Sequence, residues 1–260
     1  MSAWPDLKDK VVVIIGATAG IGAGVAAFMA ERRARVVVSG RRADKGEALA
    51  ARIGGTFVQC DTTQAADVTA LFERVKSTFG HVDLVLANAG VFIGGDSVGG
   101  VSIDNLQRQF DVNVKGPILA IKTCLPLLAA DGVAIVTSSA ISVKAVPSLI
   151  GYTISKAAID SYVRCAAEEL KATSQRIYSV NPEVFESEMS ESWGLTREAL
   201  AACNPSGVLG NPASIGQLIE DLVCGRLPQY AIGANIAIDG DGTHFPVAEV
   251  LTRAAHQKKP

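Results

Sequence analysis

Residues 11–30 read VVVIIGATAGIGAGVAAFMA, and this stretch decides the fold class. It opens with a β-branched run, Val11–Ile15, which is typical of a buried strand. Gly16, Gly20 and Gly22 follow, and a helical pattern comes next. Glycines let the backbone turn sharply into a helix and let an anion approach the N–H groups at the helix N-terminus. The stretch therefore predicts a strand, a phosphate-binding turn and a helix.

Two other interpretations of this stretch have to be weighed. It carries no charge over twenty residues and holds a GxxxG pattern, as a membrane span would. Its strand-like start, its glycine-rich centre and its lack of Leu argue against a spanning helix or a signal segment. The GxxxGxG spacing also differs from the commoner GxGxxG, so taken alone it could mark a plain turn.

Outward from this stretch, short apolar runs alternate with amphipathic segments. The expected strands are 11–15, 36–38, 56–59, 84–87, 133–137, 177–180 and 235–238, and the expected helices include 22–33, 66–79, 105–128 and 152–172. Strand and helix in repeated alternation predict an α/β fold, a Rossmann-type doubly wound parallel β-sheet of about seven strands with helices on both faces. No linker or low-complexity tract interrupts the pattern, so we expect one dinucleotide-binding and catalytic domain over residues 1–260.

Composition excludes several classes of function. The 260 residues carry a net charge of −2 with no basic block, which argues against nucleic-acid and membrane-surface partners. The five cysteines lie at least 21 residues apart, with neither a disulfide framework nor a CxxC metal motif. We therefore expect a cytoplasmic protein with no metal and a small-molecule partner.

Polar residues fall where further strands end. Asp61 follows the third expected strand, and Asn88 and Gly90 follow the fourth. Open α/β sheets bind ligands at the carboxyl ends of their strands, which makes these residues candidates for cofactor binding. Each could instead form an Asx turn or a helix N-cap.

The end of the second strand bears on the choice of cofactor. An NAD site carries an acidic residue there to bind the ribose 2′-hydroxyl, but this chain has Gly40 followed by Arg41 and Arg42. An arginine at this place can bind a 2′-phosphate, which favours NADP and leaves NAD possible. The alternative is a pair of solvated arginines on a loop.

Tyr152 and Lys156 lie four residues apart at the start of an expected helix, so they share a face. An ammonium about 4 Å from the phenol could lower the tyrosine pKa from about 10 to about 7. Such a tyrosine could act as a general acid and base. Because chance produces roughly 0.17 such pairs in a chain of this composition, the pair needs support. Ser139, at the end of the fifth strand, could hydrogen-bond a substrate carbonyl, or merely cap a loop.

With these residues together, the chain resembles the classical short-chain dehydrogenase/reductase family from about Leu7 to about Gly242. The resemblance implies a catalytic tetrad of Asn113, Ser139, Tyr152 and Lys156, with the family's usual thirteen-residue step from the serine to the tyrosine. In such a tetrad Tyr152 relays protons through the ribose and Lys156 to a water near Asn113. The cofactor residues expected from the resemblance and the arginines are Gly16, Gly20, Ile21, Gly22, Arg41, Arg42, Asp61, Asn88, Gly90, Tyr152, Lys156, Pro182, Val184 and Ser187.

The chain departs from the family pattern at several positions. Ile15 replaces a usual threonine, Ala87 replaces a second asparagine, and Ser187 replaces a threonine while keeping the hydroxyl. Glu183 stands where the family's PGxxxT motif has glycine, which puts a carboxylate close to the cofactor.

The sequence thus predicts an NAD(P)-dependent oxidoreductase that interconverts a secondary alcohol and a ketone. The alternatives are a non-catalytic NADP(H)-binding sensor or scaffold and, less favoured, a sugar-nucleotide epimerase. The substrate loop is expected at about 183–210, and a C-terminal tail at about 243–260. The resemblance also implies a homodimer or homotetramer that pairs helices 105–128 and 152–172.

Overall fold

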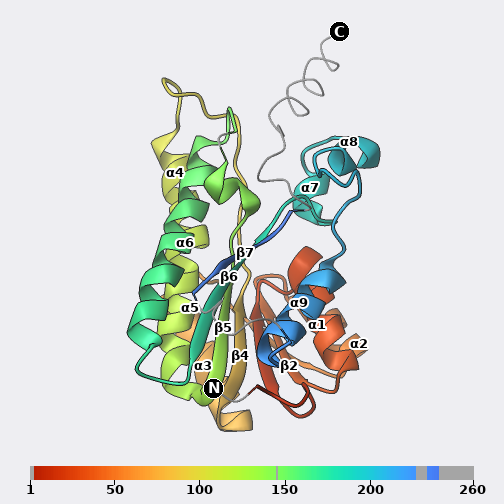
Figure 1. Cartoon of the computed structure of the whole chain (residues 1–260), viewed down its shortest axis with the longest axis vertical. Helices are drawn as coiled ribbons and strands as arrows, with labels where there is room; N and C mark the ends of the chain where they lie inside the picture. The colour runs from red at the N-terminus through yellow and green to blue at the C-terminus, as the bar shows by residue number, and fades with distance from the viewer. Residues whose placement is uncertain (1–2, 145, 227–232, 240–260) are drawn as a thin grey trace.

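The computed structural model describes residues 3–144, 146–226 and 233–239, and its centre is a seven-stranded sheet (Figure 1). The strand order is β3-β2-β1-β4-β5-β6-β7, and all neighbouring pairs are parallel. The strands are β1 Val11–Ile15, β2 Arg35–Gly40, β3 Thr56–Gln59, β4 Val82–Ala87, β5 Leu128–Thr137, β6 Arg176–Pro182 and β7 Asn235–Ile238. The predicted Rossmann-type sheet is therefore confirmed.

Helices cover both faces of this sheet, as Figure 1 shows. One apolar core joins the sheet to α1 Gly20–Glu31, α2 Ala43–Ile53 and α9 Pro212–Val223; the other joins it to α3 Ala65–Phe79, α5 Gly116–Cys124 and α6 Ile150–Leu170. Small residues bring α1 and α9 together, since a Cβ added at Gly24 would lie 2.3 Å from Pro212 Cβ. Continuous Val and Ile runs fit strands that are buried on both faces.

The expected helix 105–128 is only partly correct. Its first part is α4 (Ile103–Phe110), a π-helical turn η1 (Asp111–Lys115) follows, and after α5 the 3₁₀ turn η2 (Leu125–Leu127) leads into β5. Pro117 has no N–H to donate to the carbonyl of Asn113, so the regular α-helical bond is missing there. A π turn is how a helix accommodates such a break.

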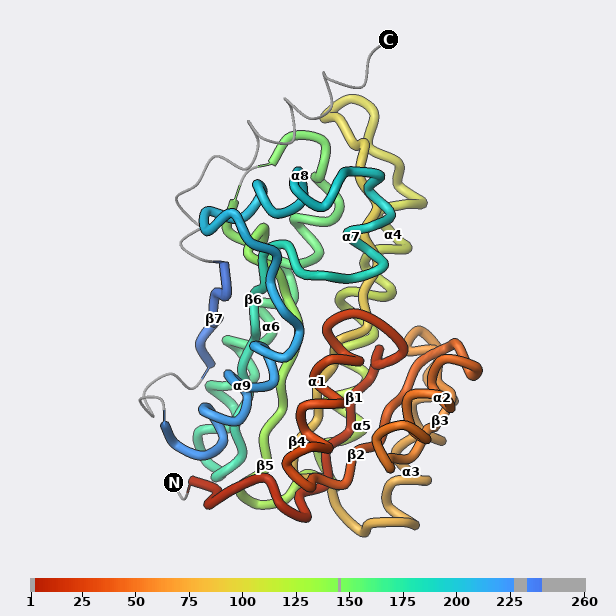
Figure 2. Tube along the Cα trace, turned by 90° about the vertical axis from the view of Figure 1, so that its right-hand side faces the viewer, coloured from red at the N-terminus to blue at the C-terminus, as the bar shows by residue number. Residues whose placement is uncertain are grey.

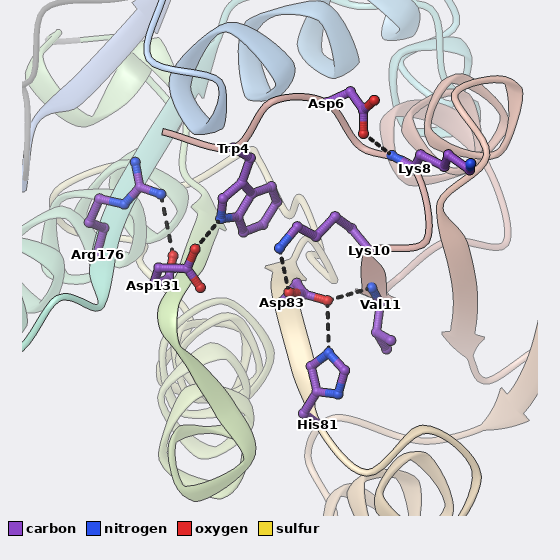
Figure 3. A network of polar contacts seen from close by, with 9 residues as sticks. All are labelled: Trp4, Asp6, Lys8, Lys10, Val11, His81, Asp83, Asp131 and Arg176. Atoms are coloured by element: carbon purple, nitrogen blue, oxygen red, sulfur yellow. Dashed lines mark hydrogen bonds and ion pairs between the residues drawn. The ribbon is translucent and has the colours of Figure 1, made fainter. Parts of the chain in front are cut away.

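Charged side chains lie at the amino ends of the strands, at one edge of the sheet (Figure 3). Buried Asp83 accepts hydrogen bonds from the Val11 N–H at 2.8 Å and from the Lys10 ammonium at 3.0 Å. The Trp4 indole N–H donates to Asp131 at 3.0 Å, and the Lys10 ammonium lies 4.4 Å from the centre of the Trp4 ring. These contacts tie the N-terminal segment to β1, β4 and β5.

The opposite, carboxyl edge carries the irregular segments. The 3₁₀ turn η3 (Ala140–Val143) and the short helices α7 (Glu188–Glu191) and α8 (Arg197–Ala201) lie there, above the strand ends in Figure 2. The expected substrate loop, 183–210, contains both short helices, whereas the expected tail, 243–260, lies outside the described residues.

Two further expectations concern the membrane and the cysteines. None of the described helices is long and apolar enough to span a membrane, and the stretch 11–30 forms β1 and most of α1 instead. All five cysteines are free thiols.

Candidate active site

A cavity of about 460 Å³ opens at the carboxyl edge of the sheet. The predicted site residues that line it are Gly16, Gly20, Ile21, Arg41, Arg42, Asp61, Asn88, Gly90, Ser139, Tyr152, Lys156, Pro182, Val184 and Ser187. The remaining two, Gly22 and Asn113, lie behind this lining. The sequence therefore brings together residues that are up to 171 positions apart, from Gly16 to Ser187.

The glycine turn is built for close backbone approach. Gly16 has φ +84°, and a Cβ there would lie 2.5 Å from the Ala89 nitrogen. Asn88 fixes the turn, since its side-chain N–H donates to the Gly16 carbonyl at 2.8 Å and its oxygen accepts from Thr137 at 3.0 Å. Gly22 packs behind the turn, where a Cβ would lie 2.3 Å from the Gly16 carbonyl oxygen.

The N-terminus of α1 fits an anionic ligand. Its N-cap residue, Ala19, has no side chain that could accept a hydrogen bond from the first N–H groups. Ala19, Gly20 and Ile21 all line the cavity. Uncapped N–H groups and the helix dipole at a cavity wall suit a pyrophosphate, so the residues present fit a dinucleotide.

Basic side chains gather at the β2 end of the cavity. Arg41 is exposed, whereas the Arg42 guanidinium donates to Thr18 Oγ1 at 3.0 Å and to Glu188 at 2.5 Å. Lys45 pairs with the same Glu188 carboxylate. These contacts direct the Arg42 guanidinium toward α7.

Asp61 lines the cavity at the end of β3. Partial burial raises its pKa, but hydrogen bonds from Thr63 and the positive charge of Arg41 together lower the pKa below its usual value. Asp61 is therefore a carboxylate at neutral pH, available to accept a hydrogen bond from a ligand.

Tyr152 and Lys156 lie on the first turns of α6, as predicted. The Lys156 ammonium donates to the Thr137 carbonyl at 3.0 Å and lies 5.7 Å from the centre of the Tyr152 ring. Burial raises the pKa of Tyr152 to about 12, against a lowering by a hydrogen bond with Ser139, and Glu183 raises it further. Burial also lowers the pKa of Lys156 to about 8, while the charge of Asp160 raises it.

The expected tyrosine pKa near 7 is therefore wrong for this structure. The expectation assumed an ammonium about 4 Å from the phenol at an effective dielectric near 20, and it left out the desolvation of both groups. Desolvation dominates instead, because Lys156 is buried, Tyr152 is half-buried in the cavity wall, and the ammonium is engaged with Thr137.

Ser139 and Asn113 complete the expected tetrad in different ways. Ser139 lies two residues after the end of β5, at the N-cap of η3, and its hydroxyl donates weakly to the Pro182 carbonyl at 3.4 Å beside Tyr152. The Asn113 side chain accepts from the Val91 N–H at 2.8 Å and donates to Ser155 at 3.1 Å. Asn113 thus holds the loop after β4 against α6 from behind the cavity wall.

The structure also shows contacts between side chains around the site that the sequence did not predict. The Phe92 ring centre lies 5.0 Å from that of Tyr152 and 5.0 Å from that of Trp193, so an aromatic wall reaches the catalytic candidate. Lys144 and Glu183 form a buried ion pair. The aromatic residues gave only an apolar signal, and nothing in the sequence indicates a pairing over 39 positions.

Val184, a predicted cofactor contact, already has both backbone polar groups hydrogen-bonded within the protein. The Val184 N–H donates to the Asn204 side chain at 3.1 Å, and the Val184 carbonyl accepts from it at 2.8 Å. Ser187 caps α7 by accepting from the Ser190 N–H at 3.1 Å. Among the described residues no cluster of potential metal ligands occurs.

Comparison with known proteins places this geometry in a family. Residues 16–244 match the family model described as enoyl-(acyl carrier protein) reductase. The chain is 32% identical over 247 residues to "Oxidoreductase asL5" of Sarocladium schorii, covering 92% of this chain and 98% of that protein. It is 29% identical over 251 residues to the NADP-dependent (R)-specific alcohol dehydrogenase of Lentilactobacillus kefiri, covering 91% and 98%.

A solved structure of similar fold supports the same family. The 3-ketoacyl-(acyl-carrier-protein) reductase of Brucella melitensis, complexed with NADH, superposes with a TM-score of 0.82 at 27% identity, covering 91% of this chain and 99% of that one. The chain therefore belongs to the classical short-chain dehydrogenase/reductase family of nicotinamide-dependent oxidoreductases.

Proposed function

We propose that the protein interconverts a secondary alcohol and a ketone, with Tyr152 as the general acid and base. The observation that carries the proposal is the meeting of Ser139, Tyr152 and Lys156 in the cavity that also holds the glycine turn. Nothing in the site favours the alternative of a protein that binds the dinucleotide without turnover.

In the reducing direction the chain's own residues would act as follows. The cofactor chemistry at this site would be transfer of a hydride from a reduced nicotinamide, if bound, to the carbonyl carbon. Ser139 donates a hydrogen bond to the carbonyl oxygen, which polarises it. Tyr152 gives that oxygen its phenolic proton, and the product is the alcohol. The pKa of about 12 fits this role, since it keeps the phenol protonated at neutral pH. Lys156, held by Thr137, orients the cofactor ribose and stabilises the phenolate that forms.

The preferred cofactor in this proposal is NADP. Gly40 leaves no carboxylate at the end of β2 to bind a ribose 2′-hydroxyl, and Arg41 lies exposed beside the cavity. The relative from Lentilactobacillus kefiri is NADP-dependent, whereas the Brucella melitensis reductase was solved with NADH. The site residues of this chain favour NADP.

A substrate panel tests the proposal. Secondary alcohols and ketones are supplied with NADP or NAD, and absorbance of the reduced nicotinamide is followed for the wild type, Tyr152→Phe and Tyr162→Phe. We expect the wild type to turn over at least one combination of substrate and cofactor. Tyr152→Phe should lose at least about a hundredfold in activity, while its cofactor affinity stays within a few fold of the wild-type value. Tyr162 is a matched control because it lies on α6, half-buried and away from the cavity lining. Activity in Tyr152→Phe above a hundredth of wild type would remove Tyr152 from the acid/base role.

Assembly as a homodimer or homotetramer stays a prediction. Ile103 on α4 and Ile154 on α6 are 68% and 41% exposed, which is what an interface through these helices requires.

A further inference from the structure

The ion pair of Lys144 and Glu183 is the most unusual feature of the cavity wall. Lys144 follows η3, Glu183 follows β6, and their side chains are only 7% and 9% exposed. Burial raises the pKa of Glu183, while the hydrogen bond and charge of Lys144 lower it. Both residues line the cavity that holds Tyr152.

Stability alone does not account for this pair. Taking two charges out of water costs several kcal/mol per ion, and apolar residues of similar volume often stabilise a fold as well or better. The family motif has glycine in place of Glu183, so the backbone here does not need the carboxylate. Among the described residues the Lys144 ammonium forms one side-chain hydrogen bond, to Glu183, and therefore keeps two N–H groups to donate.

The pair lies beside the reacting centre. The charge of Glu183 acts on Tyr152 and on Cys203, and the aromatic rings of Phe92 and Trp193 continue the wall from Tyr152. A substrate whose reacting oxygen lies at Tyr152 would thus meet apolar rings and a buried ion pair within the same cavity.

Charge decides which substrate group fits the pair. The Lys144–Glu183 pair is neutral as a whole, so a substrate carboxylate would bring an uncompensated negative charge beside Glu183. A methyl or methylene group would leave the remaining ammonium N–H groups without acceptors. A hydroxyl can accept from Lys144 and donate to Glu183 at the same time, and it adds no charge.

Building on the proposed function, we propose that the Lys144–Glu183 pair is a binding subsite for a second, neutral hydroxyl group of the substrate. The substrate class is a compact cyclic or branched diol, or the corresponding hydroxyketone, whose carbon skeleton packs against Phe92 and Trp193. One hydroxyl is oxidised at Tyr152, and the other stays bound to the pair.

Matched substrates test this assignment. The 1,2-, 1,3- and 1,4-cyclohexanediols are compared with methylcyclohexanols of the same substitution, and with the corresponding hydroxycyclohexanecarboxylates. We expect kcat/KM for at least one diol to exceed that for its methyl counterpart by about tenfold or more, because a buried polar subsite rejects a group that cannot hydrogen-bond. Equal values for all the pairs, or a preference for the carboxylates, would overturn the assignment.

Two double variants locate the effect. Lys144→Met/Glu183→Leu removes both buried charges at similar volume, and the ratio of kcat/KM for the diol over its methyl counterpart should fall at least about tenfold. Arg197→Met/Glu186→Leu removes an exposed ion pair in the same loop and should leave the ratio unchanged. An undiminished diol advantage in the first variant refutes the subsite.

Binding without turnover separates this inference from the proposed function. Trp193, one of two tryptophans in the chain, lines the cavity, so its fluorescence reports ligand binding in Tyr152→Phe supplied with NADP. Adding the Lys144→Met/Glu183→Leu substitutions should weaken diol binding at least about tenfold and methylcyclohexanol binding little. Weaker diol binding in this variant would support the subsite even if no alcohol is oxidised. Unchanged diol binding would refute the subsite even if alcohols are oxidised.

Discussion

Two buried charges at opposite edges of the sheet, Asp83 and Lys156, differ in their partners. At the amino edge, Asp83 is 4% exposed and its two oxygens accept from Lys10, the Val11 N–H and His81 (Figure 3). At the carboxyl edge, Lys156 is 3% exposed, donates to one carbonyl oxygen and forms no ion pair with a described residue. A buried charge with partners holds a fold together, whereas one without a counter-ion costs stability and leaves interactions for a ligand.

Removing the amino-edge charge should have the larger effect on stability. Asp83→Ala leaves the buried Val11 N–H without an acceptor and Lys10 without its carboxylate. We expect the free energy of unfolding, measured in urea, to fall by about 3 kcal/mol. Activity per folded molecule should stay within about twofold, since Asp83 lies at the far edge from the cavity.

His81→Ala is the control for this prediction. His81 contacts the same carboxylate at 3.1 Å, but its side chain is 51% exposed, so the loss should stay below about 0.5 kcal/mol. A loss for Asp83→Ala as small as that for His81→Ala would contradict the role given to the amino edge.

The buried charge of Lys156 at the carboxyl edge should make the free energy of unfolding depend on pH. This effect should be smaller than that of Asp83→Ala. Burial lowers the pKa of Lys156 from 10.5 to about 8, so between these values the unfolded chain binds more protons than the folded one. The free energy of unfolding contributed by Lys156 therefore rises with pH, by about 2 kcal/mol between about pH 7.5 and 9.5. Below this window both states carry the charge, and the contribution is constant.

Other groups act in the opposite direction over the same window. Burial raises the pKa of Cys60 and of Cys203 to about 11, so the unfolded thiols ionise first and stability falls as pH rises. The measurement is therefore the difference between the wild type and Lys156→Met in urea at each pH. A difference that stays flat from pH 7.5 to 9.5 would mean that Lys156 is not desolvated in the folded protein.

The contrast between the edges also explains what the sequence could predict. The succession of strands and helices along the chain follows from local signals, since β-branched runs alternate with amphipathic helices and the glycine turn marks the first crossover. The residues lining the cavity follow too, because strand ends in a parallel sheet meet at one edge. Asp61, Asn88 and Ser139 are all placed at that edge, and the structure has them in one cavity.

The ion-pair partners of charged side chains and the desolvation of the site residues could not be predicted from such local signals. The partner of Glu183 is Lys144, and the partners of Glu188 are Arg42 and Lys45. Each contact depends on how two segments that are distant in the sequence come together over the strand ends. The predicted pKa of Tyr152 was wrong for a related reason. A spacing of four residues places Lys156 on the same face but says nothing of the desolvation that dominates in the folded site.

The last prediction concerns the exposed charges at the carboxyl edge, which should act on the choice of cofactor and not on the stability of the fold. Arg41→Ala should lower the ratio of kcat/KM for NADP over NAD by roughly tenfold to a hundredfold, the value of one charge-assisted hydrogen bond to a 2′-phosphate. Glu188→Gln should raise the same ratio by a few fold. Hydrogen bonds from Lys45 and Arg42 lower the pKa of Glu188, so at neutral pH its carboxylate holds both cations and repels a phosphate beside them.

The control is Glu191→Gln, which removes a charge from the same short helix at an exposed residue outside the cavity lining and should leave the ratio unchanged. Both ratios are measured again at high salt, where screening should shrink the Glu188 effect more than the Arg41 effect, because the bound phosphate shields its own arginine from solvent. A wild type that prefers NAD, or an Arg41→Ala variant with an unchanged ratio, would make Arg41 a solvated loop residue. In that case the carboxyl edge selects its cofactor by the shape of the glycine turn and not by charge.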